Sequence, residues 1–239
     1  RSLVVTGVQT CALPICSVAK RLAHRLSVRY LDTGAIYRAI ALDLDRKGIP
    51  PDDTADLRGA LRGISIELRE GGVLLNGEDV SAAIRTPHVD GIVSAYSALG
   101  CVREALLDLQ RGQRQYGSLV VEGRDVGSVV FPDAPLKFFM TASPEARARR
   151  RCLELQRRGE PVPFEDVLSQ IRVRDRFDST RAIAPLTRPE DAVLVDTSEM
   201  TEDEVLEYLE RRVRDALEPE GREALVRSEE RRVGKECRS

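Results

Sequence analysis

The chain contains no tryptophan, and aromatic residues make up only 4% of its 239 residues. The chain therefore has few aromatic side chains on which the bases of single-stranded nucleic acids, or the rings of sugars, could stack. The formal net charge of −2 gives no overall positive field for DNA or for an anionic membrane. The composition thus disfavours nucleic-acid-binding and membrane-surface proteins, and we expect neither kind of partner.

Cysteine and histidine are scarce and scattered. The two histidines stand alone, and the five cysteines form no C-x-x-C pair and no spacing typical of metal ligands. We therefore expect reduced thiols and no zinc, as in a cytoplasmic protein. The start of the chain is loosely apolar but interrupted by polar residues and proline, and it falls far short of the ~20 apolar residues of a membrane span.

What the chain does have is a hydrophobic fraction of 42%, enough to bury the core of one large domain. Short apolar runs rich in β-branched residues alternate with helical periodicities, which is typical of a mostly parallel sheet wrapped by helices. Between residues 63 and 85 the period changes to two, and Asn76-Gly77 is a turn signal. This segment predicts a small antiparallel insertion. The expected sheet strands lie at residues 3–7, 118–121, 136–140 and 192–196.

Charge and glycine follow the most apolar of these runs. Residues 118–121 predict a strand buried on both faces, and Gly123, Arg124 and Asp125 come soon after it. Ligands of open α/β sheets bind at the carboxyl ends of the strands. A guanidinium there can grip a phosphate in a bidentate manner, and a carboxylate can accept from a ligand's N–H or O–H. A surface ion pair explains Arg124 and Asp125 alone equally well.

Two further charged segments can face that edge. One places Tyr37 and Arg38 near the N-terminal end of a predicted helix, where the helix dipole favours an anion. In the other, Arg174, Asp178 and Arg181 fall at i, i+4 and i+7, on one helical face, so that they can converge on one ligand. The structural alternatives are core packing for Tyr37 and an intrahelical ladder of ion pairs for the second segment.

An arginine-rich helix is predicted from Ser143 to Arg158, behind a Ser-Pro-Glu start. So many like charges repel each other unless an anion or a carboxylate face lies opposite them. This favours a mobile lid that closes over an anion, with a solvated basic helix as the alternative. The arginines that we single out are Arg147, Arg150, Arg151 and Arg157.

Three motifs together resemble those of bacterial cytidylate kinases. They are L-D-T-G-A-I-Y-R from Leu31, G-R-D-V-G-S-V-V-F-P-D-A from Gly123, and the segment from Arg174 that ends in R-A-I-A-P-L at Leu186. The similarity covers about residues 17–217 in the family's order. It implies a single kinase domain over residues 1–217 with a P-loop NTPase-like sheet, a monophosphate-binding insertion at about 36–99 and a helical lid at about 143–160.

The resemblance also implies an activity: transfer of the γ-phosphoryl group of ATP to CMP or dCMP, with Mg²⁺ accompanying ATP, by a monomer. In the family's pattern Arg38 and Arg124 hold the CMP phosphate, and the catalytic candidates are Arg38, Arg124, Arg174 and Arg181. In the same pattern Ser94, Arg103 and Asp125 bind the cytosine edge. Asp178, helped by Arg174, binds the sugar hydroxyls. Arg181 lies at the base and phosphate side, Thr33 and Tyr37 complete the implied CMP site, and the lid arginines close on ATP.

The chain departs from the family at its phosphate-binding loop. Such kinases need a G-x-x-x-x-G-K-S/T loop between the first strand and the first helix. Counting back from Asp32, the lysine position falls at Ile15 and the magnesium-binding position at Cys16, just before Ser17, and residues 9–14 contain no glycine. Because Ile15 supplies no charge, we expect the chain as written to be severely impaired.

Both ends of the sequence are unlike a kinase. Residues 2–15 and 227–239 resemble translated sequencing-adaptor sequence; the alternatives are the natural N-terminus of a degenerate kinase and, over residues 218–239, a disordered charged tail.

Two other functions fit the motifs. One is a catalytically dead protein that retains the CMP pocket, and the other is a P-loop kinase for another small acceptor, such as another nucleotide or shikimate.

Overall fold

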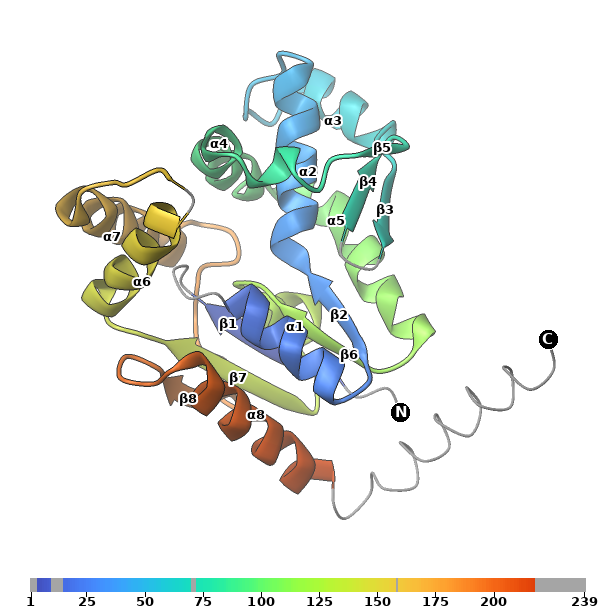
Figure 1. The fold of residues 1–239 in the computed structure, drawn as a ribbon. Helices are drawn as coiled ribbons and strands as arrows, with labels where there is room; N and C mark the ends of the chain where they lie inside the picture. The colour runs from blue at the N-terminus through green and yellow to red at the C-terminus, as the bar shows by residue number, and fades with distance from the viewer. Residues whose placement is uncertain (1–3, 10–14, 70–71, 158, 218–239) are drawn as a thin grey trace.

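The computed structural model describes residues 4–9, 15–69, 72–157 and 159–217 (Figure 1). Its centre is a five-stranded sheet in the order β2-β6-β1-β7-β8, with every neighbouring pair parallel. The strands are β1 (Val4–Gln9), β2 (Arg29–Asp32), β6 (Leu119–Glu122), β7 (Leu136–Thr141) and β8 (Val193–Asp196). The predicted α/β class, with a mostly parallel sheet flanked by helices, is confirmed.

The strand that precedes Gly123 lies inside the sheet. All four residues of β6 are buried, and β6 pairs with β2 on one side and with β1 on the other. The connection after β1 runs to β2 at one edge, whereas the connection after β6 crosses β1 to reach β7. These two connections diverge beyond the carboxyl ends of β1 and β6, which is where open parallel sheets bind their ligands.

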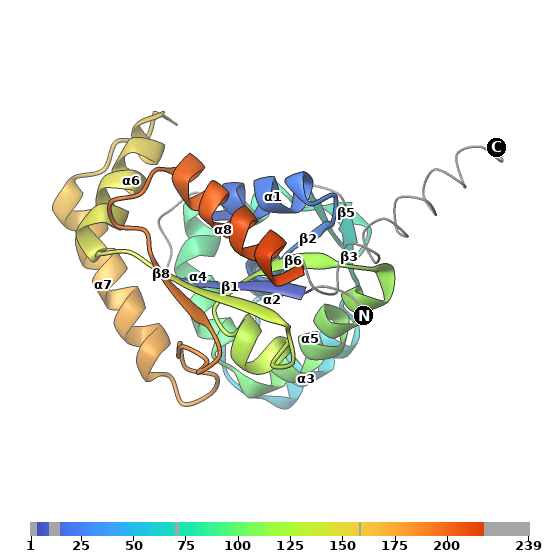
Figure 2. The ribbon, with the colours of Figure 1, turned by 90° about the horizontal axis from the view of Figure 1, so that it is seen from below.

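Helices cover both faces of this sheet, and the side chains of β6 contact helices on each face. Successive side chains of a strand point to opposite faces, so Val120 packs with α1 (Ile15–Arg25) and α8 (Glu202–Leu217). Its neighbours Leu119 and Val121 pack on the other face with α2 (Thr33–Arg46) and α5 (Gly100–Gly112). Figure 2 shows α1 and α8 on one side of the sheet and α5 on the other.

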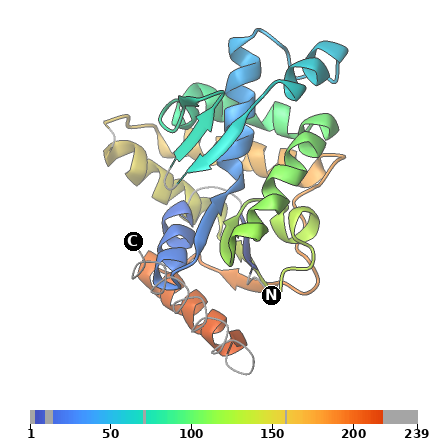
Figure 3. The same ribbon diagram turned by 90° about the vertical axis from the view of Figure 1, so that its right-hand side faces the viewer.

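Three short strands within residues 63–85 form the predicted antiparallel insertion. Its strands β3 (Ile66–Arg69), β4 (Gly72–Leu75) and β5 (Glu78–Asp79) lie beside α2, where Val73 and Leu75 pack against the helix (Figure 3). The sequence did not predict the short helix α3 (Ala55–Arg62), which is capped by the Thr54 side chain. A 3₁₀ turn at Ala83–Arg85 leads into α4 (Pro87–Ser97).

Two helices stand apart from the sheet on the left of Figure 1. They are α6 (Pro144–Arg157), the predicted arginine-rich helix, and α7 (Phe164–Thr180). Ala148 and Leu155 of α6 pack against Val167, Leu168 and Ile171 of α7, so the two helices share a small core of their own. Within the described residues, no helix combines the length and the apolar character that crossing a membrane requires.

Candidate functional site

The turn after β6 is locked to the start of α2. The Thr33 hydroxyl donates to the Glu122 carbonyl at 2.8 Å, and the Asp32 side chain accepts from the Ala35 amide at 2.9 Å, capping the helix. A Cβ atom at Gly123 would overlap the Thr33 hydroxyl and a methyl group of Val126. Glycine is therefore required where two of the three sequence motifs meet.

A buried ion pair stands behind this turn. Arg103 of α5 pairs with Asp125, and both side chains are less than one tenth exposed. The Arg103 guanidinium also donates to the Ser97 carbonyl at 2.9 Å and lies 5.3 Å from the centroid of the Tyr37 ring. Burial raises the pKa of Tyr37, so its phenol stays neutral at physiological pH. The structure thus brings Tyr37, Arg103 and Asp125 together.

The third motif reaches the same place from α7. Asp178 is buried and pairs with Arg124, and its other oxygen lies 3.8 Å from Nη1 of Arg181. The Nε of Arg181 donates to the Ala184 carbonyl at 2.6 Å. Desolvation, with Arg103 nearby, lowers the pKa of Arg181. Among the described residues, neither Nη2 of Arg181 nor the buried Nε of Arg174 has a hydrogen-bond partner. Buried guanidinium donors of this kind are free to bind a ligand.

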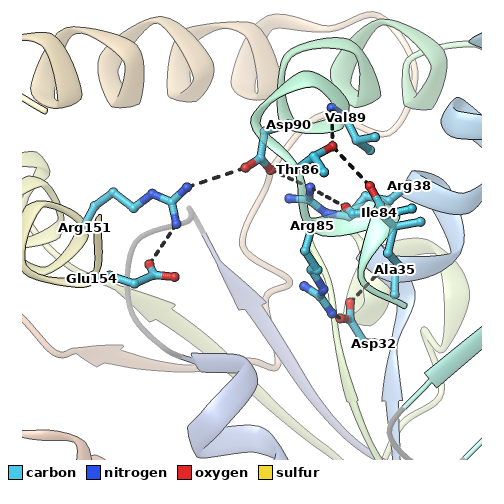
Figure 4. A network of polar contacts seen from close by, with 11 residues as sticks. Asp32, Ala35, Arg38, Ile84, Arg85, Thr86, Val89, Asp90, Arg151 and Glu154 are labelled. Carbon is cyan, nitrogen blue, oxygen red and sulfur yellow. Dashed lines mark hydrogen bonds and ion pairs between the residues drawn. The ribbon is translucent and has the colours of Figure 1, made fainter. Parts of the chain in front are cut away.

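A second network of charges lines the space between α4 and α6 (Figure 4). Nη1 of Arg38 lies 2.5 Å from Oδ1 of Asp90 and also donates to the Ile84 carbonyl at 3.4 Å. Arg151 reaches across from α6 to the other oxygen of Asp90, at 3.5 Å. Arg85 pairs with Asp32 at 2.5 Å. The sequence analysis missed Arg85 and Asp90, because a charged residue near the start of a helix has too many ordinary explanations.

The arginines of α6 have different surroundings. Arg147 is 3% exposed, holds both carboxylate oxygens of Asp175 on α7 and donates to the Ala142 carbonyl. Arg150 donates to the carbonyls of Thr197, Ser198 and Met200, and burial lowers its pKa. Arg151 faces the Asp90 network, whereas Arg157 is exposed near the end of the helix. Arg147 and Arg150 thus hold α6 to its neighbours.

Four predicted positions lie away from these contacts or outside the described residues. Ser94 is half-buried on α4, where its carbonyl accepts from the Ser97 hydroxyl. The backbone of α1 begins at Ile15, but the side chains of Ile15, Cys16 and Ser17 lie outside the described part, as do residues 10–14 and 218–239. The predictions about the phosphate-binding loop and the C-terminal tail therefore remain predictions.

A parallel sheet that gathers arginines from four segments at its carboxyl edge defines an α/β protein built to bind a phosphorylated ligand. Comparison with known proteins names the class more closely. The cytidylate kinase family model matches residues 15–215. A cytidylate kinase from Geobacter sp. (strain M21) is 47% identical over 205 residues, which span 84% of this chain and 88% of that protein. One from Mycobacterium leprae (strain Br4923) is 48% identical over 194 residues, which span 81% and 87%. The chain belongs to the cytidylate kinase family, as its motifs predicted.

Proposed function

We propose that the chain is a kinase that transfers the γ-phosphoryl group of ATP to CMP or dCMP, producing CDP or dCDP. The observation that carries this proposal is the convergence of Arg103, Asp125 and Arg181 beside Tyr37. The buried Asp125 carboxylate offers acceptors, and Nη2 of Arg181, which has no partner among the described residues, offers a donor; the edge of cytosine requires both. A kinase for an acceptor without a base, such as shikimate, would have no use for them.

The acceptor phosphate would bind between Arg38 and Arg124. Each of these arginines now pairs with a carboxylate, Asp90 in one case and Asp178 in the other. A phosphate carries more charge than a carboxylate and a third oxygen, so it can take the place of these partners. Because the attacking phosphate oxygen is already an anion, the reaction needs positioning and positive charge more than a general base. Asp178, helped by Arg174, would meet the sugar hydroxyls.

On the donor side we assign different roles to the arginines of α6. Arg151 and Arg157 would contact the phosphates of ATP, because their guanidinium groups lie toward the network of Asp90 or toward solvent. Arg147 would instead hold α6 to α7 through Asp175, and Arg150 would attach α6 to backbone carbonyls of the segment after β8, since these hydrogen bonds occupy both arginines. The helix pair α6–α7 would then move as one lid.

Mg²⁺ would enter with ATP. This ion is usually held by one or two carboxylates together with substrate phosphates. Across the described ranges, His, Cys, Asp and Glu form no group of three that could hold a metal ion. Position 16, where the family's pattern has Ser or Thr, is a cysteine, and a thiol is a poor ligand for this ion. The described residues therefore offer no site that would hold Mg²⁺ by protein ligands alone, and the ion would depend on the phosphates of ATP.

The decisive experiment compares the chain as written with a version in which residues 9–16 are replaced by a glycine-lysine phosphate-binding loop. We expect ATP- and CMP-dependent ADP release from the repaired version, and a rate at least about 10²-fold lower from the original. UMP and AMP serve as competing acceptors. CMP binding by calorimetry without turnover of the repaired version would favour a binding protein, and a preference for AMP or UMP would contradict the assignment of the cytosine site.

We also propose that the protein is cytoplasmic, as its scattered cysteines indicate, and that it is a monomer, as the family resemblance implies. Sedimentation of the purified chain tests the oligomeric state. A dimer at micromolar concentration would contradict this part of the proposal.

A further inference from the structure

One carboxylate joins two arginines from separate parts of the molecule. Asp90 lies in the first turn of α4, and its Oδ1 is 2.5 Å from Nη1 of Arg38 on α2. Its Oδ2 is 3.5 Å from Nη2 of Arg151 on α6. Figure 4 shows Asp90 between the two guanidinium groups. The side chain therefore connects the monophosphate site to the helix that we propose as a lid.

These contacts are partly shielded from water. The Arg38 side chain is 13% exposed, and the side chains of Asp90 and Arg151 are each 30% exposed. Ion pairs in such surroundings are less screened than pairs on the open surface. The other groups that face them are the Ile84 carbonyl, which accepts from Arg38, and Glu154, which lies 2.8 Å from Arg151. Asp90 is the carboxylate that both arginines share.

We propose that Asp90 is a positioning residue of the acceptor site. Without a nucleotide, its carboxylate occupies Arg38 in place of a phosphate and at the same time holds α6 through Arg151. A nucleoside monophosphate must displace it, because a carboxylate and a phosphate dianion that share one guanidinium repel each other. The binding of the acceptor is thereby coupled to the position of α6. This inference rests on the proposed function, since it takes Arg38 as a phosphate-binding residue.

The test is the affinity for CMP measured by calorimetry without ATP, which makes it independent of the phosphate-binding loop. Asp90→Asn keeps the size of the side chain and removes its charge. We expect CMP to bind about threefold to tenfold more tightly, because the phosphate no longer has to displace a carboxylate. We also expect faster amide exchange over residues 144–157 in the nucleotide-free variant, because α6 has lost one of its attachments.

A matched control is available on the same two helices. Asp45 of α2 lies 2.8 Å from His88 of α4, and neither residue contacts Arg38 or Arg151 in the structure. Asp45→Asn should change the affinity for CMP less than about twofold and leave the exchange of α6 unchanged. Asp90→Ser, which also suits the first turn of a helix, repeats the test if the Asn variant does not fold.

Equal or weaker CMP binding by both Asp90 variants, at unchanged unfolding midpoints, would overturn the inference. A larger gain in CMP affinity for Asp45→Asn than for Asp90→Asn would also overturn it. So would an unchanged amide exchange rate over α6 in the Asp90 variants. If the unaltered chain binds no CMP, the proposed function fails and this inference falls with it. Failure of the proposed function is thus recognised by the absence of CMP binding to the unaltered chain. Failure of the Asp90 inference is recognised by the behaviour of the variants when the unaltered chain does bind CMP.

Discussion

At the scale of single residues, a buried charge that loses its partner is costly, because it has been removed from water. Asp125→Ala would leave the buried guanidinium of Arg103 without its carboxylate, and we expect it to lower the free energy of unfolding by about 3–5 kcal/mol. Asp133→Ala is the control, because Asp133 is exposed and its pair with Arg114 should contribute less than about 1 kcal/mol. Urea unfolding measures both, and equal losses would contradict the importance that we give to the buried pair.

Gly123 is the second residue whose replacement has a definite expected result. The methyl group of alanine would overlap the Thr33 hydroxyl, so Gly123→Ala should lower the free energy of unfolding by about 1–3 kcal/mol and weaken CMP binding. Gly91, inside α4, has open space around it, and Gly91→Ala should raise stability by about 0.5–1 kcal/mol. A neutral Gly123→Ala variant with intact CMP binding would show that the turn can relax.

At the scale of elements, α6 and α7 form a unit that depends on Arg147. Arg147→Met removes both hydrogen bonds to Asp175, and because Asp175 is 27% exposed its charge can then be hydrated. We expect a loss of about 1–3 kcal/mol and faster amide exchange over residues 144–157 and 164–180. Arg149 is exposed on the same helix, and Arg149→Met should change neither quantity appreciably. Unchanged exchange in Arg147→Met would mean that the apolar contacts suffice.

The sequence predicted the elements that have strong local signals. Four of the five strands of the central sheet were predicted from their short apolar runs, and β2 was not among them. The three charged motifs were predicted to face one another at the carboxyl edge of the sheet, where such sheets bind ligands. The short helix α3 was missed, since eight residues carry too little periodicity. The different surroundings of Arg147 and Arg151 could not be predicted either, because their partners Asp175 and Asp90 lie far away in the sequence.

At the scale of the whole molecule, surface carboxylates govern the response to acid. Hydrogen bonds from neighbouring side chains and backbone amides hold the pKa of several carboxyls below the ordinary values of 3.8 for Asp and 4.5 for Glu; these include Asp53, Asp79, Asp196 and Glu210. A lowered pKa in the folded state stabilises the protein above the unfolded pKa, and this stability is lost as the pH falls through the folded pKa.

We therefore expect urea midpoints to be similar at about pH 7 and 5 and clearly lower at about pH 3.5. Glu210 accepts hydrogen bonds from both Arg25 and Arg214, so Glu210→Gln should reduce part of this acid dependence. A midpoint that stays constant down to about pH 3.5 would contradict the lowered pKa values.

The position of β1 has a consequence for how the protein is made. Residues 4–9 leave the ribosome before both strands between which they lie, because Val4 pairs with Leu119 and Val5 pairs with Leu136. At typical rates of translation the nascent strand waits roughly ten seconds for its first neighbour. The segment from α2 to α5 can meanwhile assemble from local contacts. During synthesis the helices that carry Arg38 and Arg103 can thus form before β6, β7 and α7 supply the rest of the acceptor site and complete the sheet.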